Sequence, residues 1–149
     1  MSSLKIERMG PDQVEVMHAA NRLFSDVFGD EAYHGEPAGD GHLHKLLSDR
    51  KFIALVALID GAMVGALAAY ELVKYEAERS EIYIYDLAVL ETHRRQGVAT
   101  ALIEALKPIA DEAGAWVIYV QADPPDAPAV ALYDKLGTRE EVFHFDIMP

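Results

Sequence analysis

The stretch that decides the fold is Glu91-Thr92-His93-Arg94-Arg95-Gln96-Gly97-Val98-Ala99-Thr100, which directly follows the apolar run 82–90. It predicts a strand, then a tight loop, then the start of a helix. Small residues at a helix N-terminus let an anion approach the unpaired backbone N–H groups, and two arginines add charge-assisted hydrogen bonds. The stretch therefore predicts a site for the pyrophosphate of a cofactor, with an ordinary surface loop as the alternative.

Taken alone, the pattern Arg-x-x-Gly-x-Ala at Arg94, Gly97 and Ala99 is weak evidence, because basic residues before a helix are often solvated. Two commoner nucleotide-binding motifs are absent from the sequence. No glycine is followed by lysine, which excludes the Gly-x-x-x-x-Gly-Lys-Ser/Thr loop, and Gly-x-Gly-x-x-Gly does not occur. The cofactor is therefore not expected to be held by either of these loops.

The composition indicates one domain with a sizeable core, because the chain has 149 residues of which 51% are hydrophobic. It has no cysteine, which excludes disulfides, thiolate metal sites and a covalent acyl-cysteine intermediate. A reducing compartment, the cytoplasm, is the expected location. The first residues lack an apolar signal region and the longest apolar runs are too short to span a bilayer, so we expect a soluble protein.

The formal net charge of −12 bears on the choice of partner. Such a charge repels nucleic acids and anionic membranes, so neither is an expected partner. A cationic partner is favoured. The alternative is that the acidity serves solubility alone.

Hydrophobic periodicity and turn residues predict a mixed α/β fold. Asp60-Gly61 is a two-residue turn signal that joins two antiparallel strands, and Gly114 and Gly137 are placed to end helices. Pro108 either kinks its helix or stops it early. Strands are expected at residues 5–8, 52–59, 63–72, 82–90, 116–120 and 142–148, and helices at residues 11–28, 43–47, 98–113 and 129–136.

The hairpin, the central strand, the Arg/Gln-x-x-Gly-x-Gly/Ala loop and the following helix together resemble the GCN5-related N-acetyltransferase (GNAT) superfamily. The stretch Ala129-Val130-Ala131-Leu132-Tyr133-Asp134-Lys135-Leu136-Gly137 is similar to the superfamily's cofactor-side helix. The resemblance implies a single acetyltransferase domain over residues 1–149. It also implies a central, mostly antiparallel mixed sheet flanked by helices, with acetyl-coenzyme A bound at the splayed central strands.

Three stretches resemble the gentamicin-type aminoglycoside 3-N-acetyltransferases: Ser80-Glu81-Ile82-Tyr83-Ile84-Tyr85-Asp86-Leu87-Ala88-Val89, Val117-Ile118-Tyr119-Val120-Gln121-Ala122-Asp123 and Arg139-Glu140-Glu141-Val142-Phe143-His144-Phe145-Asp146-Ile147. The resemblance implies acetyl transfer to the 3-amino group of the 2-deoxystreptamine ring, antibiotic resistance and a homodimer. Residues 31–44 and the pair Pro124-Pro125 depart from this pattern, which leaves the range of accepted drugs open.

Asp86 and Tyr133 are the expected catalytic residues. An ionised carboxylate in the apolar run around Asp86 is costly without a cationic or hydrogen-bonding partner, although an aspartate at a surface edge is the alternative. The resemblance places Asp86 at the substrate amine, where it accepts a proton directly or through a water. It gives the Tyr133 hydroxyl the role of donor to the departing thiolate, whereas an unmatched helix would favour a core tyrosine.

The resemblance also assigns residues to the cofactor. The backbone of Leu87, Ala88 and Val89 is expected to align the pantetheine arm as an added strand, with the Val89 N–H polarising the thioester carbonyl. The remaining cofactor residues are the pyrophosphate loop, Arg94, Arg95, Gln96, Gly97, Val98, Ala99 and Thr100, and the helix side, Asp126, Ala129, Leu132 and Tyr133.

The expected substrate-binding residues are His34, Tyr85, Asp86, Asp123 and Asp146. Asp126 is a further candidate for ammonium contacts, and an ordinary exposed loop histidine is the alternative for His34. No spacing of the six histidines suggests a metal site, so no metal is expected. Two other functions stay open: a polyamine or protein N-acetyltransferase, and a non-catalytic acyl-coenzyme A binding module.

Overall fold

The computed structural model describes residues 3–29 and 36–149. His34, one of the expected substrate-binding residues, lies outside the described residues. The chain divides into two compact units, Met1–Tyr119 and Val120–Pro149, and each is described by itself.

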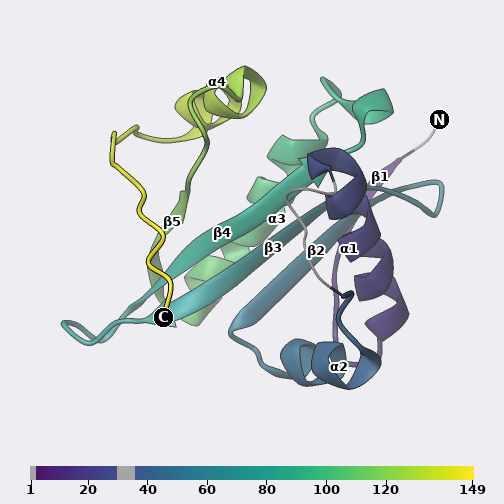
Figure 1. Ribbon diagram of the computed structural model, residues 1–149, viewed down its shortest axis with the longest axis horizontal. Helices are drawn as coiled ribbons and strands as arrows, with labels where there is room; N and C mark the ends of the chain where they lie inside the picture. The colour runs from purple at the N-terminus through teal and green to yellow at the C-terminus, as the bar shows by residue number, and fades with distance from the viewer. Residues whose placement is uncertain (1–2, 30–35) are drawn as a thin grey trace. The chain divides into compact units, whose positions relative to one another are not determined.

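A five-stranded sheet forms the centre of the first unit (Figure 1). Its strands follow one another in chain order, and the pairs β1–β2, β2–β3 and β3–β4 are antiparallel. The Asp60-Gly61 turn is confirmed, since both residues have positive φ and Ile59 pairs with Ala62 across it. The strands are β1 (Leu4–Arg8), β2 (Phe52–Ile59), β3 (Ala62–Val73), β4 (Ser80–Val89) and β5 (Ala115–Val120).

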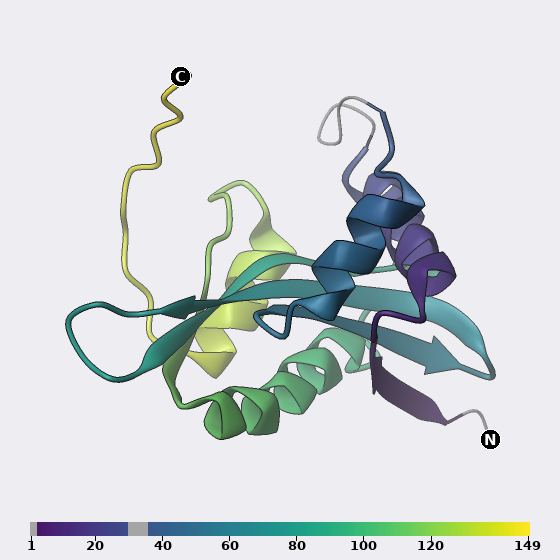
Figure 2. The same cartoon turned by 90° about the horizontal axis from the view of Figure 1, so that it is seen from below.

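The helices of the first unit cover both faces of the sheet, which confirms the mixed α/β fold. Figure 2 shows α1 (Val14–Phe28) and α2 (Asp40–Ser48) on one side and α3 (Val98–Ala113) on the other. Under α1 and α2, Phe24 and Leu43 pack with Phe52 in one buried cluster. On the α3 side the buried side chains include Val98, Leu102, Leu106, Ile82 and Ile84.

Helix α3 runs through Pro108 and ends at Gly114, so the predicted end is confirmed and the early stop is wrong. Proline removes one backbone hydrogen-bond donor from the helix. The helix continues because Leu102, Leu106 and Ala110 form a buried apolar stripe that packs against the sheet. Gly114 has a left-handed φ of 81°, and its N–H donates to the last turn of the helix.

The second unit contains α4 (Ala127–Leu136) and a C-terminal segment. The predicted strand at residues 142–148 is wrong, because the structure assigns no strand there and the sheet does not include it. A strand is held by hydrogen bonds to a neighbouring strand, so alternation of apolar residues alone does not form one. Phe143, Phe145 and Ile147 are instead 90%, 79% and 88% exposed.

Among the described residues no helix combines the length and the apolar composition needed to cross a membrane.

Candidate active site

A β-bulge in β4 shapes the surface around Asp86. Ala68 pairs with Asp86 and the next residue, Ala69, pairs with Ile84, so Tyr85 is an extra residue on β4. Ala68 belongs to the buried cluster under α1 and α2. Because paired residues lie on the same face of a sheet, Asp86 faces the α1 and α2 side, where it is half-buried.

Four tyrosines extend across the same face. Tyr70 on β3 pairs with both Phe52 and Tyr83, which places all three on the side of Asp86. The Tyr85 ring lies 6.0 Å from the Tyr70 ring and 5.8 Å from the Tyr83 ring, centroid to centroid. Tyr83 in turn stacks on Tyr119 of β5 at 4.7 Å. We call Tyr70, Tyr83, Tyr85 and Tyr119 the tyrosine row.

The phenols of Tyr70 and Tyr83 stay protonated at neutral pH. Burial raises the pKa of Tyr70, and Tyr85 and the Asp86 carboxylate raise it further. Burial also raises the pKa of Tyr83, with added contributions from Tyr119, Tyr85 and Asp86. Neutral phenols can donate and accept hydrogen bonds, so this surface combines one carboxylate with several neutral hydroxyls.

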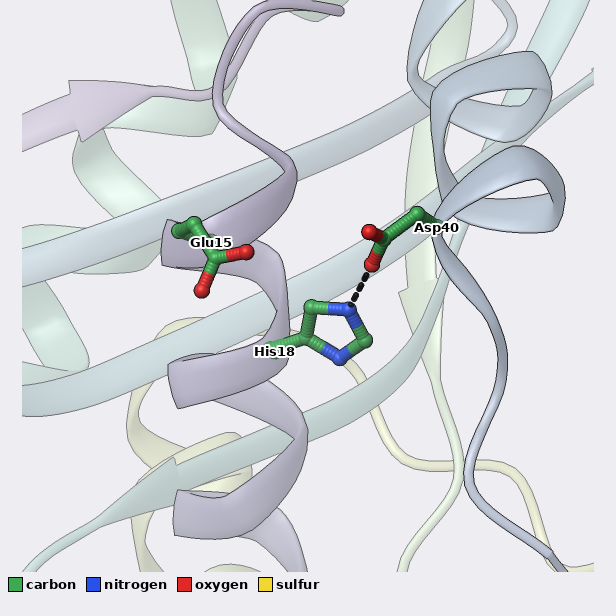
Figure 3. Close-up of side chains that lie close together, drawn as sticks. All are labelled: Glu15, His18 and Asp40. Carbon is green, nitrogen blue, oxygen red and sulfur yellow. Dashed lines mark hydrogen bonds and ion pairs between the residues drawn. The ribbon is translucent and has the colours of Figure 1, made fainter.

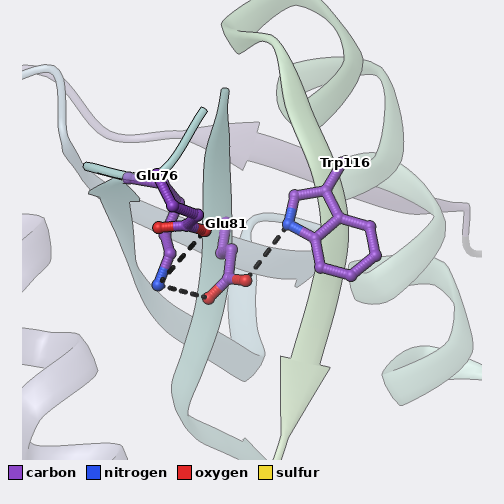
Figure 4. A network of polar contacts seen from close by, with 4 residues as sticks. Glu76, Glu81 and Trp116 are labelled. Atoms are coloured by element: carbon purple, nitrogen blue, oxygen red, sulfur yellow. Dashed lines mark hydrogen bonds and ion pairs between the residues drawn. The ribbon is translucent and has the colours of Figure 1, made fainter. Parts of the chain in front are cut away.

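A polar cluster holds β4 to β5 at the start of β4 (Figure 4). The Trp116 indole N–H donates to Glu81 Oε2 at 3.1 Å, and Lys74 Nζ lies 3.7 Å from Glu81 and 3.9 Å from Glu76. The Arg79 guanidinium lies over the Trp116 ring, with Cζ 4.3 Å from the ring centroid. Glu81 and Tyr83, the residues of β4 that make these contacts with β5, both lie in the first half of the strand.

The loop after β4 is wound tightly, as the sequence predicted. A short 3-10 helix, η1 (Glu91–His93), is followed by two residues with positive φ, Arg95 at 61° and Gly97 at 80°. The Arg94 side chain turns back, and its Nε donates to the carbonyl oxygen of Val89 at 3.3 Å. Arg94 and Arg95 are both exposed, so both side chains are accessible to a ligand.

The N-terminus of α3 has the features that an anion requires. No side chain caps the helix, and the N–H of Ala101 makes the first helical bond, to the Gly97 carbonyl oxygen at 2.9 Å. The preceding N–H groups, of Val98, Ala99 and Thr100, lie in the turn that α-helices leave unpaired. A side-chain atom added at Gly97 would meet nothing within 4 Å. The residues present therefore fit a pyrophosphate.

The remaining predicted residues belong to the second unit. Asp126 is the N-cap of α4 and accepts from the Ala129 N–H at 3.3 Å, so it has a structural role that the sequence reasoning missed. Burial raises the pKa of Tyr133, and the Asp126 carboxylate raises it further. Asp123 is exposed, and Asp146 is hydrogen-bonded to His144 at 2.9 Å.

One group of possible metal ligands occurs among the described residues, on the first two helices. Figure 3 shows the His18 ring on α1 directed toward Asp40 at the start of α2, with Glu15 on α1. The ligand atoms lie within 4.8 Å of one another, and His18 Nε2 is 2.7 Å from Asp40 Oδ1. Local spacing could not reveal this group, because Asp40 is remote in sequence. The bond fastens the start of α2 to α1.

The chain is similar in sequence and in structure to known acetyltransferases. The model of the acetyltransferase (GNAT) family matches residues 15–138. The crystal structure of an aminoglycoside acetyltransferase from an uncultured soil metagenomic sample is 53% identical, with a TM-score of 0.95, over 99% of each chain.

Of two further relatives, one is named as an aminoglycoside acetyltransferase and the other as an N-alpha-acetyltransferase. Another aminoglycoside acetyltransferase from an uncultured soil sample was solved with trehalose and with sisomicin, at 36% and 35% identity. Both structures have a TM-score of 0.91 and cover 98% of this chain and 96% of theirs. An N-alpha-acetyltransferase of Saccharolobus solfataricus is 33% identical over 57% of this chain. The chain spans about half the length of that relative, 55%.

Proposed function

Because the chain belongs to the acetyltransferase (GNAT) family, we propose that it transfers an acetyl group from acetyl-coenzyme A to an amine of an aminoglycoside. The observation that carries the proposal is the likeness over nearly the whole chain to an aminoglycoside acetyltransferase at 53% identity. The surface around Asp86, with a carboxylate beside neutral tyrosines, suits a sugar that carries ammonium groups.

The chain offers two kinds of group to the cofactor. The N–H groups of residues 98–100 and the exposed Arg94 and Arg95 side chains would hold the pyrophosphate, and Arg94 also supports the loop through its bond to Val89. The backbone of residues 87–89 lies in the second half of β4, beyond Glu81 and Tyr83, and would align the extended arm. Acetyl-coenzyme A supplies the acetyl group as a thioester.

Asp86 accepts the proton of the attacking amine, directly or through a water, because only the neutral amine is a nucleophile. Tyr133 holds a proton for the departing sulfur. A phenol can serve as the acid only while it is protonated, and a raised pKa keeps Tyr133 protonated through neutral pH. No cysteine is present to carry the acetyl group, so the transfer is direct.

The acceptor amine is the 3-amino group of the 2-deoxystreptamine ring. Tyr85, Asp123 and Asp146 contribute to binding of the remaining rings and ammonium groups. The net charge of −12 favours such a polycation. Acetylation removes a positive charge from the drug, and resistance in the cytoplasm would follow. The sugar and the aminoglycoside bound by one relative support an acceptor surface that recognises sugar rings.

A second candidate is acetylation of protein N-termini, which the similarity to an N-alpha-acetyltransferase favours. Turnover of acetyl-coenzyme A with sisomicin, with spermidine and with a peptide that has a free α-amino group separates the candidates. We expect sisomicin to give the highest kcat/KM. A preference for the peptide would establish the second candidate, and cofactor binding without turnover would indicate a binding module.

We also propose a homodimer that buries the C-terminal segment, residues 142–149. Phe143, Phe145 and Ile147 alternate with His144 and Asp146, which is the pattern of a half-buried strand. The three apolar side chains are nevertheless largely exposed in the single chain. Contiguous exposed apolar residues are typical of protein interfaces, and pairing with a second copy would complete the strand.

The double variant Phe143→Asp, Phe145→Asp should convert the dimer to a monomer, because two charges cannot be buried unpaired in the interface. Light scattering after gel filtration measures the mass of each species. Val73→Asp is the control, since Val73 is 64% exposed on β3 and lies outside the segment. Equal masses for the wild type and the double variant would contradict this interface.

A further inference from the structure

Two side chains of the tyrosine row are exposed to solvent, so packing in the core does not explain their positions. Tyr85 is 63% exposed and Tyr70 is 38% exposed, although each makes ring contacts with other members of the row. Large aromatic side chains that are exposed but held by their neighbours are typical of binding surfaces. The row crosses β3, β4 and β5 and lies on the same face as Asp86.

We propose that the tyrosine row is the platform on which the non-reacting rings of the acceptor lie, with Tyr85 selecting ring-shaped amines. The inference rests on the proposed function and deepens it, because it names the part of the acceptor that is recognised. A cyclitol or sugar ring presents C–H groups on its face and ammonium groups at its edge. Both are attracted by the electron-rich face of an aromatic ring.

The bulge in β4 explains why Tyr85 has this role. In a regular strand, consecutive residues point to opposite faces. Tyr85 shares the face of Tyr83, two residues before it, and contacts Tyr70 and Tyr83 there, and the extra residue brings Asp86 to the same face. A ring that lies on Tyr85 is therefore held next to the carboxylate that receives the amine proton. A linear polyamine offers charge to Asp86 but has no ring face for Tyr85.

The other tyrosines support this arrangement. The Tyr83 ring is held in place by the Tyr119 ring, which stacks parallel to it with an angle of 5° between the planes. Tyr70 contacts Phe52 of the core cluster at 5.3 Å, which anchors the opposite end of the row. The raised pKa values of Tyr70 and Tyr83 keep their hydroxyls neutral, so they can also bond to hydroxyl groups of the acceptor.

The test compares Tyr85→Ala with Tyr85→Phe, using sisomicin as the acceptor. Tyr85→Ala should raise KM about threefold to thirtyfold, the range expected for loss of a stacking and cation–π contact. The kcat should change little, because Tyr85 does not move a proton. Tyr85→Phe keeps the ring face and should retain a KM close to that of the wild type. Tyr75→Ala is the control, since Tyr75 is 95% exposed outside the row and should have no effect.

Calorimetric titration with sisomicin and with spermidine completes the test. Tyr85→Ala should weaken the binding of sisomicin by a larger factor than that of spermidine, which has ammonium groups but no ring face to lie on Tyr85. An unchanged KM and affinity for sisomicin in Tyr85→Ala, or an equal loss in Tyr75→Ala, would overturn the platform while the proposed function stands. If the wild-type protein neither binds nor acetylates sisomicin, both the proposed function and the platform are overturned.

Discussion

Replacing Asp86 with asparagine should lower the rate of aminoglycoside acetylation about a hundredfold to ten-thousandfold, the usual value of general-base assistance. The amide keeps the shape and polarity of the side chain but cannot accept the proton of the amine. The stability of the folded protein should change little, because a neutral amide is less costly to bury than a carboxylate. Steady-state kinetics and the melting temperature of the same variant measure the two effects separately.

Glu81→Gln is the matched control for this experiment. It removes one negative charge from the same strand, at a residue whose contacts are with Trp116 and Lys74 at the start of β4. Its turnover should stay near that of the wild type. Near-normal turnover in Asp86→Asn would refute the catalytic role of Asp86. Lost turnover together with a much lower melting temperature would instead show that Asp86 is needed for folding.

The second large effect is expected at the cofactor loop, where Gly97→Asp should weaken acetyl-coenzyme A binding about tenfold to a hundredfold. The added carboxylate would lie beside the N–H groups of the first turn of α3 and repel the pyrophosphate. The estimate corresponds to loss of one hydrogen bond to a charged group, about 1.5–3 kcal/mol. Calorimetric titration of each folded variant with acetyl-coenzyme A measures the dissociation constant.

Two controls separate charge from backbone strain. Gly97→Asn imposes a similar left-handed strain without the charge and should bind the cofactor more tightly than Gly97→Asp. Gly61→Asp adds the same residue at the same φ of 80°, in the turn between β2 and β3, where it should leave binding unchanged. Equal affinity in Gly97→Asp and the wild type would remove the loop from the cofactor site.

Most elements of the fold could be predicted from the sequence, because burial of one apolar face determines them. Burial of the apolar stripe that includes Leu102, Leu106 and Ala110 stabilises α3 enough for the helix to continue beyond Pro108. Residues 142–148 show the limit of the same reasoning. Their alternation has the period of a strand, but whether a strand forms depends on a neighbour that periodicity does not identify.

The candidate site was predicted only in part. The loop ending at Gly97 has a local signature, since two arginines and small residues occur together at the start of a helix. The alternating Tyr83 and Tyr85 are also visible in the sequence. Their contacts with Tyr70 and Tyr119 are not, because these depend on the register of three strands and on a bulge. Bulges are set by pairing with the neighbouring strand, which one strand's sequence does not specify.

The central claim is acetyl transfer to the 3-amino group of an aminoglycoside, and nuclear magnetic resonance of the product tests it most directly. The wild-type protein is incubated with acetyl-coenzyme A and sisomicin, and the product is assigned by carbon–proton correlation. We predict one acetyl group, attached to the 3-amino nitrogen of the 2-deoxystreptamine ring. Acetylation at another amine would contradict the position, and the absence of any acetylated sisomicin would contradict the proposed function.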